Sequence, residues 1–169
     1  AKRHFIKTTF LKNTLLFEEK EIEEGMNAFL EKSDNEFYRI EDIFAMPHSQ
    51  KIAVIINVYK KEEKRFRIAR KMFFEVNRHY NVENFWKFSE TSLQVFAINS
   101  QNHILCFSYL PKERQPLLIT YDIHGDAFLE KKITLQKFNY HRTALLLTQQ
   151  GELMGAFLKK NLLYFVLWR

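Results

Sequence analysis

Six histidines are the first candidates for metal binding or acid–base chemistry, because imidazole gains and loses a proton near neutral pH. They are His4, His48, His79, His103, His124 and His141. No two of them form an HxH, HxxxH or HExxH pattern, so the spacing brings no pair together on a strand or helix. All six fall in or near expected turns. The sequence therefore predicts surface histidines, with no metal ligand, no cofactor and no catalytic residue.

A second candidate for chemistry is the expected hairpin around Asp122. Asp122 followed by Glu130-Lys131-Lys132 is similar to the Asp…Glu-x-Lys arrangement of metal-dependent nucleases, in which carboxylates hold Mg²⁺ and a lysine stabilises developing charge. A solvated strand face is the better explanation of Glu130 and Lys132, and Asp122, His124 and Asp126 suit hydrogen bonds to the turn backbone. An enzyme would need a site assembled from distant loops or completed by a missing segment. Its candidate residues are His103, His124, Asp122, Asp126 and Glu130.

The basic run at residues 60–71, KKEEKRFRIARK, could bind phosphates, because Phe66 stands among cationic side chains. The candidate basic binding surface consists of Lys60, Lys61, Arg65, Arg67, Arg70 and Lys71. A net charge of +6 and a pI of about 9.3 permit attraction to nucleic acid, anionic lipid or acidic proteins without selecting among them. Glu62 and Glu63 dilute this charge, so a solvated hairpin end is the simpler interpretation and nucleic-acid binding is the alternative.

Composition favours a folded chain with a genuine core. Of the 169 residues, 46% are hydrophobic and 15% aromatic, which is more apolar surface than a solvated chain carries. With 4 Gly and 3 Pro, the turns must depend on Asn, Asp, Ser, Gln and Lys. The single Cys106 excludes an intramolecular disulfide and is expected in the core.

The sequence shows no membrane span, because it has no run of about 18 uncharged apolar residues. Its first residues, AKRHFIKTTF, lack the apolar stretch of a signal peptide. Since the chain begins at Ala1, a processed exported precursor stays open and the compartment is undecided.

Hydrophobic alternation predicts strands through most of the chain. Residues 4–11 and 14–22 form an expected hairpin, with a helix over residues 15–30 as the alternative, since its glutamates are good helix formers and Gly25 is not. Residues 52–59 are nearly all apolar and rich in β-branched side chains, typical of a strand buried on both faces. Residues 77–91 are expected to be irregular. The other expected strands are residues 36–45, 65–76, 93–99, 104–110, 117–123, 127–135, 143–148, 153–158 and 162–168.

Residues 65–76 fit a strand better than the alternative, a helix, and in a strand simple alternation divides the side chains between two faces. One face receives Phe66, Ile68, Arg70, Met72 and Phe74. The other receives Arg65, Arg67, Ala69, Lys71 and Phe73. The pattern therefore predicts one partly apolar face and one basic face.

A tripeptide of Ser or Thr, Gln and a polar residue begins at residues 49, 100 and 148, which are 51 and then 48 residues apart. Each copy leads into a strand-like run, and a lysine follows at the same offset, as Lys61, Lys112 and Lys160. Four-stranded antiparallel units of this period resemble the blades of a β-propeller. The best local match is LITYDIHG at residues 118–125, where an apolar strand ends in Tyr-Asp before a Gly turn. The Gly-His and Trp-Asp signatures of WD repeats are absent.

The resemblance implies an all-β fold of antiparallel four-stranded units that is propeller-like and incomplete, with a β-sandwich or an α+β fold as alternatives. We expect a single domain over residues 1–169, with units at roughly 4–35, 36–90, 91–138 and 141–169. Unpaired sheet edges favour association. The sequence therefore favours a non-catalytic interaction or scaffold protein that binds another chain, or a second copy, through loops and sheet edges. The alternatives are the basic nucleic-acid-binding module and the loop-assembled enzyme.

Overall fold

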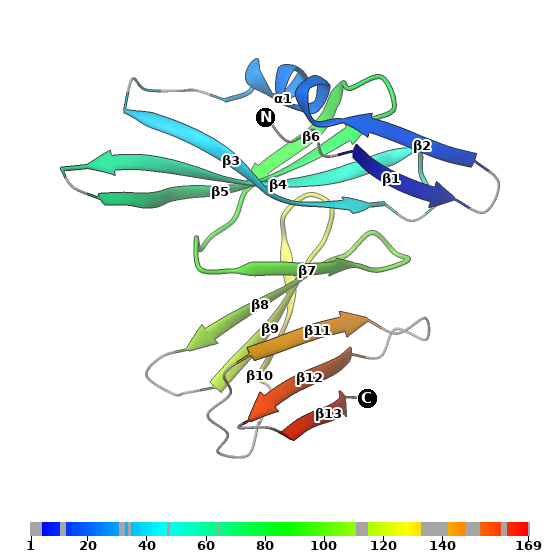
Figure 1. Cartoon of the computed structure of the whole chain (residues 1–169), viewed down its shortest axis with the longest axis vertical. Helices are drawn as coiled ribbons and strands as arrows, with labels where there is room; N and C mark the ends of the chain where they lie inside the picture. The colour runs from blue at the N-terminus through cyan, green and yellow to red at the C-terminus, as the bar shows by residue number, and fades with distance from the viewer. Residues whose placement is uncertain are drawn as a thin grey trace. The chain divides into compact units, whose positions relative to one another are not determined.

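Antiparallel strands dominate the described chain, which confirms the predicted all-β class. The computed structural model describes residues 5–10, 13–30, 33, 35–46, 48–63, 65–110, 115–132, 142–147, 153–159 and 162–168. The chain divides into two compact units, Ala1–Thr91 (unit 1) and Ser92–Arg169 (unit 2), and each is described by itself (Figure 1). The single domain expected over the whole chain stays a prediction.

Unit 1 combines a hairpin, a helix and a four-stranded meander. The hairpin of β1 (Phe5–Phe10) and β2 (Asn13–Glu18) confirms the predicted one, and the helix given as the alternative follows it as α1 (Glu19–Asn27). The meander consists of β3 (Glu36–Ala45), β4 (Lys51–Glu62), β5 (Arg65–Asn77) and β6 (Val82–Lys87), paired in chain order.

Unit 2 contains a second four-stranded meander and a three-stranded sheet. The meander consists of β7 (Gln94–Ile98), β8 (Ile104–Leu110), β9 (Gln115–Tyr121) and β10 (Ala127–Lys132). The three-stranded sheet consists of β11 (Arg142–Leu147), β12 (Leu153–Lys159) and β13 (Leu162–Trp168). Two four-stranded antiparallel sheets are thus present, as the sequence predicts.

One strand was missed, because β6 lies inside the segment expected to be irregular. Asn84 and Glu83 are poor strand formers, so local residue preferences do not predict a strand here. Pairing with β5 overrides that preference: Trp86 stacks on Phe73 with ring centroids 5.1 Å apart, and Phe85 stacks on Phe74 at 5.7 Å.

The recurring tripeptide has the same place in both meanders. Residues 49–51 and 100–102 each lie where the first strand turns into the second. The third copy, at residues 148–150, lies outside the described residues. The described strands form no closed ring of sheets.

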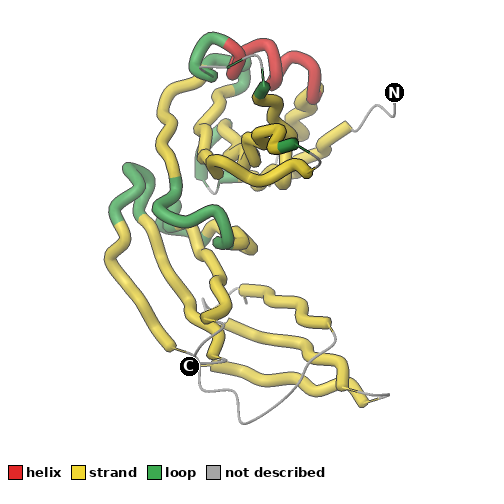
Figure 2. The backbone as a smooth tube through the Cα atoms, turned by 90° about the vertical axis from the view of Figure 1, so that its left-hand side faces the viewer, coloured by secondary structure: helices red, strands yellow, loops and turns green. Residues whose placement is uncertain are grey.

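The core of unit 1 forms where α1 covers one face of the meander (Figure 2). Ile22 and Met26 of α1, with Leu30 beyond it, pack against alternate side chains of β4 and β5. The strand residues of this core are Ile52, Val54, Ile56, Val58, Met72, Phe74 and Val76. Ala53 and Ile55 point to the opposite face of β4 and are also fully buried, so β4 is buried on both faces as predicted.

Gly25 lies inside α1 and does not end it. The presence of a glycine at this position is explained by the turn between β5 and β6, which the helix approaches very closely. A Cβ atom at Gly25 would clash with the backbone oxygen of Tyr80. The same turn receives a second contact from the start of the helix, where the N–H of Glu18 donates to the Tyr80 hydroxyl at 3.3 Å. Glycine therefore costs helix propensity here and permits the close approach.

Three hairpin turns, at residues 77–81, 99–103 and 122–126, share one geometry. In each, the side-chain oxygen of the first residue accepts hydrogen bonds of 2.8–3.1 Å from the N–H groups two and four residues later. These first residues are Asn77, Asn99 and Asp122. The fourth residues are Tyr80, Asn102 and Gly125, with φ of 63°, 60° and 90°. The prediction that Asn and Asp build the turns is confirmed.

We predict that Gly25→Ala lowers the free energy of unfolding by about 1–3 kcal/mol, because overpacking against Tyr80 exceeds the gain in helix propensity. Chemical denaturation followed by circular dichroism measures this. Glu24→Ala, on the exposed side of the same helix, is the control and should change stability by less than about 0.5 kcal/mol. A stabilised Gly25→Ala variant would contradict the close contact.

Candidate binding surface

The long hairpin of β4 and β5 carries the candidate surface at its free end. The two strands pair from Lys51 opposite Asn77 to Glu62 opposite Arg65. β6 pairs with β5 only between Met72 and Val76, and the Phe88 N–H donates to the Lys71 carbonyl at 3.0 Å. Residues 65–70 therefore have β4 on one side and none of the described strands on the other.

A β-bulge in β5 decides which side chains share a face at this end. Val58 lies opposite Arg70, whereas the next residue, Tyr59, lies opposite Ile68, so Ala69 is the extra residue. The bulge moves Arg70 to the face of Arg67 and moves Lys71 to the face of Ile68. The two faces predicted by simple alternation over residues 65–76 are therefore wrong, because the bulge shifts the alternation by one residue.

Three aromatic side chains, Phe37, Tyr59 and Phe66, form the aromatic tip on the face away from α1. Phe37 stacks on Tyr59 with centroids 5.2 Å apart and meets Phe66 edge-on at 5.1 Å. The Arg39 guanidinium carbon lies 5.5 Å from the Phe37 centroid and 5.9 Å from that of Tyr59, within cation–π range. Phe66 is 60% exposed, so the aromatic tip presents a large apolar ring to solvent.

The opposite face of the same end carries exposed cations. Lys60 and Arg67 lie directly across from each other on β4 and β5, where like charges destabilise a sheet. Glu36 lies opposite Lys60, but its carboxylate contacts the Arg70 guanidinium at 2.7 Å. No ion pair to Lys60 or Arg67 is formed within the described residues.

The six basic residues singled out from the sequence therefore separate into three groups. Lys60, Arg65 and Arg67 are exposed on the α1 side, and Lys61 is exposed on the side of the aromatic tip. Arg70 is half-buried against Glu36, and Lys71 is buried with its Nζ 2.6 Å from Glu41. Sequence reasoning missed Phe37, Arg39 and Tyr59. Alignment of the expected strands 36–45 and 52–59 as a hairpin would have placed Phe37 near Tyr59.

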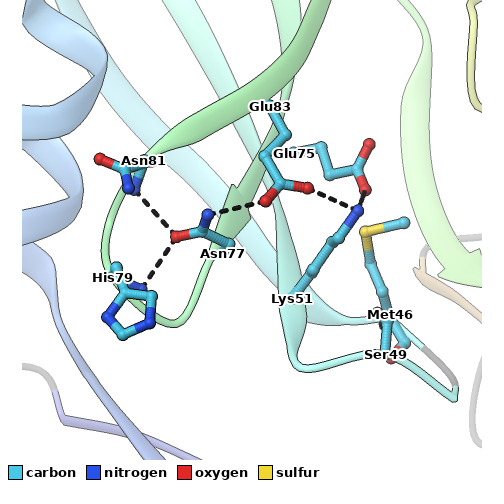
Figure 3. A network of polar contacts seen from close by, with 8 residues as sticks. All are labelled: Met46, Ser49, Lys51, Glu75, Asn77, His79, Asn81 and Glu83. Carbon is cyan, nitrogen blue, oxygen red and sulfur yellow. Dashed lines mark hydrogen bonds and ion pairs between the residues drawn. The ribbon is translucent and has the colours of Figure 1, made fainter.

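The other end of the β4–β5 hairpin is fastened by a polar network (Figure 3). Lys51 Nζ contacts Glu75 at 2.5 Å and Glu83 at 2.6 Å, and Asn77 Nδ2 donates to Glu83 at 2.7 Å. The Asn77 side-chain oxygen accepts the turn N–H groups of His79 and Asn81. Lys51 thus joins β4 to both β5 and β6.

Charge pairing shifts pKa values in this network. Hydrogen bonds to Glu75 and Glu83 raise the pKa of Lys51, and hydrogen bonds from Lys51 and Asn77 lower the pKa of Glu83. The stabilisation from Glu83 is lost as pH falls through its lowered folded-state pKa. That from Lys51 is lost as pH rises through its raised folded-state pKa. Both contributions are therefore present between the unfolded values, about pH 4.3 and 10.4.

Two of the residues considered for an enzyme site, Asp122 and His103, make structural contacts in the second meander. The Asp122 carboxylate accepts the turn N–H groups of Asp126 and His124, which hold the pKa of Asp122 below its usual value. The His103 ring packs against Phe128 with centroids 4.6 Å apart. Asp122 thus serves the turn backbone as predicted, and Cys106 is buried as predicted.

No group of three or more His, Cys, Asp or Glu side chains in the described ranges is arranged to hold a metal ion. No described helix is long and apolar enough to cross a bilayer.

Comparison with known proteins gives no family for this chain: no family model matches the sequence, and no curated protein matches it. The candidate surface is therefore interpreted from its own geometry.

We predict that Lys51→Met lowers the free energy of unfolding by about 2 kcal/mol, because it leaves the buried Glu75 carboxylate without its cation. Urea denaturation at pH 7 measures this loss. Adding Glu75→Gln to Lys51→Met should recover most of it, since the uncompensated charge is then removed. A double variant no more stable than Lys51→Met would contradict this account of the network.

Proposed function

We propose that this chain is a non-catalytic protein-interaction module that binds another polypeptide through sheet edges and loops, with the free end of the β4–β5 hairpin as its main contact. The observation that carries this proposal is the combination of exposed Phe66 with a β5 edge that has none of the described strands beside it at residues 65–70. Unpaired edges are templates for an additional strand.

The chemistry of the aromatic tip supports a protein partner. Aromatic residues and arginine are enriched at the centres of protein interfaces, where they contribute most of the binding energy. Phe37 and Tyr59 hold one another and Arg39 in place before any partner arrives. The surface is therefore preorganised, which lowers the entropy lost on binding.

Nucleic-acid binding is the second candidate, because a base could stack on Phe66 while Lys61, Arg65 and Arg67 contact phosphates. Such binding would weaken steeply with salt. We favour a polypeptide because Arg70 and Lys71 are engaged with Glu36 and Glu41. Fewer cations of the basic run then remain for phosphates, and the open strand edge has no use in nucleic-acid binding.

We further propose that the two meanders are propeller-like units of an incomplete array. Support comes from the matching place of residues 49–51 and 100–102 and from the chain-order pairing in both meanders. In such an array, uncovered edges such as that of β5 are the contacts through which a partner chain, or a second copy, completes the assembly.

We predict that benzoylphenylalanine at position 66, irradiated in cells that produce the chain, forms an adduct of defined mass with a polypeptide. Adding Arg67→Glu should reduce its yield at least about tenfold, as expected when a charged contact becomes repulsive. The control places the same probe at Phe128, which is 53% exposed on β10. Denaturing gels with protease and nuclease treatment identify the adduct.

Three results would contradict the proposed function. They are an adduct at position 66 that nuclease removes, a yield no greater than at position 128, and an adduct that Arg67→Glu leaves unchanged.

A further inference from the structure

We propose that residues 65–70 of β5 bind, as an added strand, an extended peptide segment in which acidic and apolar side chains alternate. This inference rests on the proposed function and adds to it the chemistry of the partner. It is drawn from the order of side chains along the edge, the charges beside it and the point where the edge ends.

The edge presents two kinds of side chain in alternation. Arg65 and Arg67 point to the α1 side of the sheet, and Phe66 and Ile68 point to the side of the aromatic tip. A strand laid beside this edge alternates in the same way, and its side chains lie next to those of β5 on each face. Carboxylates on one face and apolar groups on the other are therefore its matching sequence.

The charges on the α1 side favour an anionic neighbour. Lys60 and Arg67 repel one another in direct register, and the nearby Glu36 is already bound to Arg70. Glu62 lies opposite Arg65, two residue pairs further towards the hairpin end on the same face, and is exposed. A carboxylate on an added strand would lie beside Arg67, on the side where no described strand pairs with β5, and would relieve a repulsion that no ion pair among the described residues offsets.

The length of the edge defines the length of the segment. At one end the edge is limited by Lys71, whose carbonyl already accepts a hydrogen bond from the Phe88 N–H. At the other end it is limited by Arg65, the first residue of β5. Six residues in extended conformation span about 20 Å. The bulge at Ala69 interrupts the pairing near the Lys71 end, so the segment is expected to pair most regularly beside Arg65–Phe66–Arg67.

The test uses the full chain, labelled with ¹⁵N, and a synthetic peptide of alternating glutamate and valine, about eight residues long. We expect saturable NMR shift changes at residues 65–70. A peptide of the same composition with its glutamates and valines in separate blocks should bind at least about tenfold more weakly.

Two peptide variants test strand pairing directly. N-methylation of the valines and N-methylation of the glutamates remove hydrogen-bond donors from opposite edges of the added strand. One of these two peptides should lose binding and the other should retain it, since only one edge faces β5. Equal binding by both would show a charge contact without an added strand and would overturn the inference.

Arg67→Glu tests the charges, with Arg78→Glu, an exposed arginine beyond the other end of β5, as the matched control. Arg67→Glu should weaken peptide binding at least about tenfold and raise the urea midpoint, because it places a glutamate opposite Lys60. Arg78→Glu should leave peptide binding within about twofold. A loss of binding that accompanies a lowered midpoint would overturn the assignment.

The outcomes separate this inference from the proposed function. Failure of the alternating peptide while the polypeptide adduct at position 66 persists would overturn the inference alone. Failure of both would overturn both. Tighter binding of a single-stranded DNA oligonucleotide of equal charge than of the peptide would overturn both in favour of nucleic-acid binding.

Discussion

The antiparallel pairing of β4 with β5 is the constraint on which unit 1 depends. It supplies the strand residues that α1 covers, and the turn that follows β5, at residues 77–81, meets α1 at Gly25. At one end Lys51 of β4 pairs with Glu75 of β5 and with Glu83 of β6, and so joins the three strands. At the other end β5 extends beyond β6, and its residues 65–70 have no described strand on that side.

The bulge at Ala69 links this architecture to the surface. By advancing the alternation one residue, it sends Lys71 and Arg70 into internal ion pairs and leaves Phe66 beside Phe37. The two ends of the hairpin then differ in electrostatic design. Opposite charges meet around Lys51, whereas like charges meet at Lys60 and Arg67. Favourable charge pairing thus stabilises the sheet at the Lys51 end, whereas unfavourable like-charge pairing occurs at the end where binding is proposed. Such departures from stabilising pairing are expected at functional sites.

Sequence reasoning predicted the strands well because local alternation and turn chemistry determine them. The expected bounds of β3, β8 and β13 match the structure. The surface was less predictable, because it depends on partners distant in sequence. Glu36 is 34 residues from Arg70, and Glu41 is 30 residues from Lys71. Gly25 counted against a helix in the sequence for a similar reason, because the glycine is explained by the close approach of Tyr80, a residue distant in sequence.

Amide hydrogen exchange along β5, measured by NMR on the chain alone at low concentration, tests the central claim that this strand has an open edge. The account predicts that outward-facing amides within residues 65–70 exchange far faster than those of residues 72–76, which β6 covers. Uniform protection from residue 65 to residue 76 would contradict it, because the edge would then already be paired.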